Sequence, residues 1–116
     1  MKFKSMFAGV ALGFGMLAGF SAQAIELAPY SAQTFSKAQQ ENKAVALHFH
    51  AEWCSTCRVQ ESVLKKLESD KSLDVLVLVV DYDKEKDLKK AFKVPYQSTF
   101  VVFKGKTETG RILGDT

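Results

Sequence analysis

Only two cysteines and two histidines occur in the 116 residues of this sequence, and all four lie in the stretch HFHAEWCSTC, residues 48–57. The sequence has no internal repeat, collagen-like period or low-complexity tract, which excludes repeat and fibrous proteins. Its composition is ordinary, with 47% hydrophobic and 25% charged residues. Length and composition together predict one globular domain.

No apolar run is long enough to span a bilayer. The run Met6–Phe20 is about 15 residues long, whereas a spanning helix needs ~20. It follows two lysines and leads to an A-x-A site that ends at Ala24, which is the pattern of a secretory signal peptide. We expect residues 1–24 to be removed, which leaves a domain over residues 25–116. With no cysteine near the cleavage site, we expect no lipid anchor. Because the apolar run is short and is expected to be removed with the signal peptide, we also expect no stable membrane anchor and a periplasmic location.

The expected mature chain also lacks an excess of charge. Removing the two leader lysines from 16 basic residues leaves 14 against 13 acidic residues, a formal charge of +1. This balance gives no electrostatic reason to expect a nucleic acid or an anionic membrane as partner. Export would place the cysteines where disulfides persist.

Hydrophobic periodicity and turn signals predict alternating helices and strands. The helices are expected over residues 31–44, 54–70 and 84–93, and the strands over residues 44–51, 73–83, 98–103 and 107–113. In the second helix we expect Val59, Val63 and Leu64 on the buried face and Gln60 on the outer face. The order predicts an α/β protein with a central mixed sheet, helices on both faces and a closing hairpin.

Cys54 and Cys57 are three residues apart, directly after a predicted strand and at the start of a predicted helix. This spacing puts both side chains on one face, within reach of a disulfide. Free backbone N–H groups and the helix dipole at that position stabilise a thiolate, the nucleophile of disulfide exchange. A C-x-x-C motif in a βαβ pattern therefore predicts a redox dithiol.

The segment AEWCSTCR, together with VVDYD and the final TFVVFKGK, resembles the thioredoxin family over nearly the whole expected mature chain. The resemblance implies a thioredoxin fold that lacks the family's final helix, and a thiol–disulfide oxidoreductase without a cofactor. It implies that Cys54 attacks a substrate disulfide, that Cys57 resolves the intermediate as a Cys54–Cys57 disulfide, and that Trp53 shapes the site.

With a tryptophan directly before the dithiol, the sequence resembles the reducing members of the family more than the strong oxidants. We therefore expect a reducing role on protein disulfides, a redox partner that recycles the dithiol, and a monomer.

Two departures from the family concern groups near the dithiol. His48 occupies the position of a buried aspartate that is thought to move protons for the resolving cysteine, and Val79 replaces the accompanying lysine. A histidine can transfer protons, and an apolar surrounding would lower its pKa. His50, on the same face of the strand, is expected to support the active-site loop.

The third departure is in the loop before the strand at residues 98–103. Ser98, and not Pro95, falls where thioredoxins carry a cis-proline that faces the dithiol. A non-proline cis bond costs about 2.5–4 kcal/mol, so the Gln97–Ser98 bond is expected to be trans or locally strained. The resemblance implies that Gln97, Ser98 and Thr99 bind an extended substrate.

Two other functions remain open at this point. The Cys/His cluster has the ligand types of a zinc site, but the cysteine and histidine pairs lie closer together than in the usual pattern. Copper(I) binding by the two thiols is the related possibility. The second is an interaction module with a structural disulfide, although so small a loop adds little stability.

Overall fold

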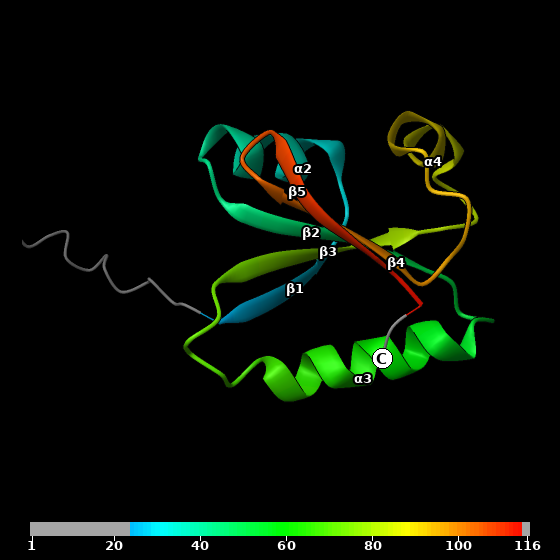
Figure 1. Ribbon diagram of the computed structural model, residues 1–116, viewed down its shortest axis with the longest axis horizontal. Helices are drawn as coiled ribbons and strands as arrows, with labels where there is room; N and C mark the ends of the chain where they lie inside the picture. The colour runs from blue at the N-terminus through cyan, green and yellow to red at the C-terminus, as the bar shows by residue number, and fades with distance from the viewer. Residues whose placement is uncertain (1–23, 115–116) are drawn as a thin grey trace, which may run out of the picture.

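The computed structural model describes residues 24–114, which form a five-stranded mixed sheet with helices on both faces (Figure 1). The strand order is β1-β3-β2-β4-β5. Strands β1 and β2 run parallel to β3, whereas β4 is antiparallel to β2 and to β5. The strands are β1 (Ile25–Pro29), β2 (Ala44–His50), β3 (Val75–Asp81), β4 (Thr99–Lys104) and β5 (Thr107–Leu113). The predicted mixed sheet is confirmed, whereas residues 1–23 of the expected signal peptide lie outside the described residues.

The three helices are α2 (Ala32–Gln40), α3 (Ser55–Leu67) and α4 (Lys86–Phe92). Figure 1 shows α3 on one face of the sheet and α2 with α4 on the other. Phe35 of α2 and Phe92 of α4 both pack against Phe103 of the sheet, each with 5.4 Å between ring centroids. On the opposite face Leu64 of α3 packs with Ala46 and Val77. No helix within residues 24–114 has the length and apolarity needed to cross a bilayer.

The first described element is a strand that the sequence reasoning missed. Strand β1 pairs in parallel with β3, with Ile25 opposite Val75. It has five residues and ends in Pro29, and it lies at the edge of the sheet, where proline is tolerated. A short edge strand with no clear alternation leaves little periodic signal, and the prediction therefore began with the helix.

Strand β2 leads into the segment that carries the two cysteines, at one end of the sheet. Its alternate residues Val45, Leu47 and Phe49 enter the core beneath α2 and α4, so the residues between them, including His48, face α3. Because β4 is antiparallel to β2, Phe49 lies opposite Thr99. The loop that carries the cysteines and the loop that precedes β4 therefore meet at the carboxyl end of β2.

Candidate active site

Cys54 lies at the N-terminus of α3 and caps it. The backbone N–H of Cys57 donates to Cys54 Sγ at 3.1 Å, and both cysteines are present as thiols. Cys54 has an extended backbone (φ −97°, ψ 109°), while the helix proper begins at Ser55. A backbone donor and the N-terminus of α3 both face this sulfur.

The second sulfur lies in a different environment. Cys57 is 0% exposed and Cys54 is 5% exposed, and Cys57 Sγ lies 3.8 Å from the carbonyl oxygen of Phe49. Burial, reinforced by the hydrogen bond with Cys54, raises the pKa of the Cys57 thiol to about 11. At neutral pH Cys57 is therefore a thiol, and Cys54 is the sulfur better placed for attack.

Trp53 forms the exposed rim beside the dithiol. Its side chain is 60% exposed, and Nε1 donates to Oδ2 of Asp83, in the turn after β3, at 2.8 Å. A pocket of about 290 Å³ lies next to it and is lined by His50, Glu52, Trp53, Val79, Val80, Asp81 and Asp83. The indole is thus anchored at its nitrogen and presents its ring to solvent.

His48 is fully buried between the sheet and α3. Its ring stacks on Phe100 of β4, with 4.2 Å between centroids, and its Nε2 lies 2.9 Å from Oε1 of Gln60. Its Nδ1 has no hydrogen-bond partner among the described residues. Burial lowers the pKa of His48 from 6.5 to about 4, so the ring is neutral at pH 7. As expected, Val79 is its neighbour on β3.

Gln60 is buried, and its predicted place on the outer face of α3 was wrong. It is 3% exposed, whereas Val59, which was expected inside, is 49% exposed. The buried stripe of α3 is Cys57, Gln60 and Leu64. The helix phase follows from placing Cys57 against β2, and residues three and seven positions later then face the sheet. Counting from the second cysteine would have found Gln60.

The loop before β4 lies beside the buried sulfur. Ser98 N–H donates to the carbonyl oxygen of Phe49 at 2.8 Å, the same oxygen that lies near Cys57 Sγ. Ser98 O accepts from Gly114 N–H at 2.9 Å and from Gln60 Nε2 at 3.1 Å. These bonds fix the loop next to the dithiol.

The Gln97–Ser98 peptide bond is trans, and the backbone of Ser98 itself is strained. No cis peptide bond occurs within residues 24–114, and Ser98 has φ +59°, in the left-handed region. Its three backbone hydrogen bonds offset the cost of that conformation. Thr99 is buried and donates through Oγ1 to the carbonyl oxygen of Tyr96 at 2.8 Å, whereas Gln97 is half-buried at the surface.

His50 lies between two carboxylates. Its Nε2 is 3.6 Å from Glu61 Oε1 and its Nδ1 is 3.9 Å from Glu52 Oε2, and its ring centroid is 5.5 Å from that of His48. Despite these neighbours, no three His, Cys, Asp or Glu side chains within residues 24–114 are arranged to hold a metal ion. The structure brings the cysteines together with the loop that holds Ser98.

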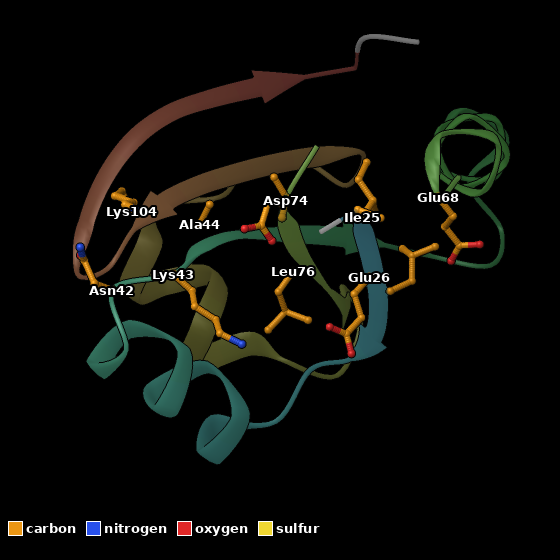
Figure 2. Close-up of a pocket in the computed structure, with 12 residues that line it drawn as sticks. Ile25, Glu26, Asn42, Lys43, Ala44, Glu68, Asp74, Leu76 and Lys104 are labelled. Carbon is orange, nitrogen blue, oxygen red and sulfur yellow. The ribbon is translucent and has the colours of Figure 1, made fainter. Parts of the chain in front are cut away.

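A larger pocket of about 650 Å³ lies away from this site (Figure 2). Its lining includes the first residues of three strands, Ile25, Ala44 and Val75, and the last residue of β4, Lys104. The dithiol follows the last residue of β2, so this pocket is at the opposite end of the sheet and contributes no group to the candidate active site.

Comparison with known proteins places this arrangement in context. The family described as Thioredoxin matches residues 26–116. Thioredoxin H2-1 from Oryza sativa subsp. japonica is 36% identical over 72 residues, 62% of this chain and 51% of that protein. Thioredoxin H2 from Arabidopsis thaliana is 35% identical over 80 residues, 69% of this chain and 59% of that protein. The chain therefore spans between half and three fifths of these relatives.

A solved structure confirms the predicted thioredoxin fold. The crystal structure of Trxlp from Edwardsiella tarda EIB202 matches with a TM-score of 0.74 and 32% identity, over 78% of this chain and 89% of that chain. The last described element of this chain is the strand β5.

Proposed function

The chain belongs to the thioredoxin family, and from that premise we propose that it is a thiol–disulfide oxidoreductase acting on protein disulfides through Cys54 and Cys57. The observation that carries the proposal is the pair of unequal sulfurs at the start of α3. Cys54 Sγ accepts a backbone N–H at 3.1 Å, while Cys57 is fully buried beneath it. One sulfur is placed to attack and the other to resolve.

The reaction balances in two steps in the reducing direction. The Cys54 thiolate attacks one sulfur of a substrate disulfide, forms a mixed disulfide and releases the other substrate sulfur as a thiolate. Cys57 then loses its proton and attacks Cys54 Sγ, which forms the Cys54–Cys57 disulfide and releases the second substrate thiolate. The substrate gains two electrons and two protons, and the protein loses them. A dithiol partner restores the reduced protein.

We propose that His48 accepts a proton only transiently during the resolving step. Burial lowers the pKa of His48 to about 4, so the ring returns the proton readily. His48 can therefore assist the resolving step without being charged at rest.

The substrate binds as an extended segment between the rim and the loop. Trp53 offers an exposed ring, and Gln97 lies at the surface of the loop that the Ser98 hydrogen bonds hold beside the sulfurs. Backbone groups of such a loop can pair with a substrate chain. Buried Thr99 supports the loop through its bond to Tyr96 O.

The direction of exchange is tested by the redox potential of the Cys54–Cys57 pair. We propose a reductant, because Trp53 precedes the first cysteine as in the reducing relatives. Equilibration of the chain with known ratios of reduced and oxidised glutathione should give a potential near −270 mV, the value of thioredoxin. A value near −120 mV, typical of a strong oxidant, would contradict the reducing direction and leave the exchange chemistry intact.

We also propose that the chain is exported to the periplasm after removal of residues 1–24. Two lysines, an apolar run and an A-x-A site support this. Mass spectrometry of the protein recovered from the periplasm of cells that express the full sequence should show an N-terminus at Ile25. Recovery only in the cytoplasm, with Met1 or Lys2 at its start, would contradict export.

A further inference from the structure

A buried amide connects the two polar groups beneath the dithiol. Gln60 projects from α3 between His48 of β2 and the carbonyl of Ser98, with distances of 2.9 Å and 3.1 Å. All three residues are buried. A buried amide is costly without hydrogen-bond partners, so its orientation is determined by what each neighbour can donate or accept.

The Ser98 carbonyl determines which end of the amide faces His48. A carbonyl oxygen only accepts, so the group of Gln60 that faces it must be the NH₂ donor. The opposite orientation would put two oxygens 3.1 Å apart and lose that hydrogen bond. Gln60 Oε1 therefore faces His48 Nε2.

The amide oxygen in turn determines where His48 carries its proton. Gln60 Oε1 only accepts, so a hydrogen bond at 2.9 Å requires a proton on His48 Nε2. A neutral imidazole carries a single ring proton, and His48 is neutral at pH 7 in its buried position. The lone pair is then on Nδ1, the nitrogen without a hydrogen-bond partner among the described residues.

We propose that Gln60 is a positioning residue that holds His48 as the Nε2–H tautomer, so that Nδ1 is the only atom of this ring able to accept a proton during disulfide exchange. The inference rests on the proposed function for its role in exchange, and on geometry alone for the tautomer. The same side chain ties the substrate loop to α3 through Ser98 O.

The test is the ring ¹⁵N spectrum of the full chain labelled at histidine. In the wild type at pH 7, His48 should show a protonated Nε2, an unprotonated Nδ1 and an observable, slowly exchanging Hε2. Gln60→Met has a similar length and neither hydrogen bond, so Hε2 should exchange too fast to be seen. Gln60→Glu keeps an acceptor towards Nε2 and should retain an observable Hε2, while it loses the hydrogen bond to Ser98 O. The control Gln33→Met makes the same change on the exposed face of α2 and should leave the spectrum unchanged.

The kinetic readout is the release of substrate from the mixed disulfide. Gln60→Met should slow this step about tenfold, the size expected from losing the hydrogen bond that holds His48, with less effect on the first attack by Cys54. A wild-type spectrum with the proton on Nδ1 overturns the proposal, even if no variant folds. A wild-type spectrum as expected in a chain without exchange activity supports the tautomer assignment and contradicts the proposed function.

Discussion

Replacing Cys54 with serine should abolish the reduction of insulin disulfides by the chain, down to the rate of the buffer control. A serine hydroxyl is a far weaker nucleophile than a thiolate and cannot form the mixed disulfide. The environment of residue 54 makes the effect specific, because its sulfur accepts the Cys57 N–H at 3.1 Å at the start of α3. Turbidity of the released insulin B chain measures the loss.

Cys57→Ser is the matched variant, with the same chemical change three residues later. It should retain the attack by Cys54 but lack the resolving sulfur, so it should accumulate as a covalent complex with its substrate. A thiol-blocked, non-reducing gel detects that complex, and added dithiothreitol should release it. Insulin reduction by Cys54→Ser at the wild-type rate would contradict the proposed function, as would a stable complex formed by Cys54→Ser instead of Cys57→Ser.

The second large effect is a loss of stability in acid that depends on His48. The pKa of this residue is about 4 in the folded chain, because burial disfavours its charged form, and it is ~6.5 in an unfolded chain. Between these values the unfolded chain binds more protons, so the free energy of unfolding falls as the pH falls. The contribution of neutral His48 to the free energy of unfolding is complete above pH ~6.5. About 2–3 kcal/mol of that contribution should be lost by pH ~4.5.

Urea unfolding of the wild type and of His48→Phe, at pH 7 and at pH 4.5, measures this contribution. Phenylalanine keeps a ring to stack on Phe100 and does not titrate. It removes the partner of Gln60 Oε1, so the variant should be less stable at pH 7. The difference between the two chains should shrink by about 2–3 kcal/mol at the lower pH. The titratable groups that face His48, namely His50 and Glu61, are present in both chains. A constant difference would show that His48 does not titrate as its burial implies.

Hydrophobic periodicity and residue spacing were enough to predict most of the helices and strands and the position of the dithiol. The buried run of β3, the amphipathic α3 and the placement of Cys54 and Cys57 at a helix N-terminus follow from local pattern, and the structure has them. The edge strand β1 was missed because it is stabilised by pairing with β3 and has little pattern of its own. Such pairing is a property of the folded chain.

The buried polar groups were harder to predict than the elements. A count of apolar residues placed Gln60 outside, because glutamine is usually exposed. Its burial depends on two partners that are distant in sequence, His48 and Ser98. The sequence did not decide whether the Gln97–Ser98 bond is trans or locally strained. In the structure the bond is trans and Ser98 has a left-handed backbone. Which conformation the loop adopts depends on acceptors supplied by other elements, and local sequence does not encode them.

The exposed indole of Trp53 gives the protein its own optical reporter. The chain contains a single tryptophan, so all tryptophan emission comes from a ring that adjoins Cys54 and is held at Asp83. Conversion of the neighbouring dithiol to a disulfide should therefore change the emission of every tryptophan in the sample. Emission intensity can follow oxidation and reduction of the dithiol in real time, without a label and without altering either cysteine.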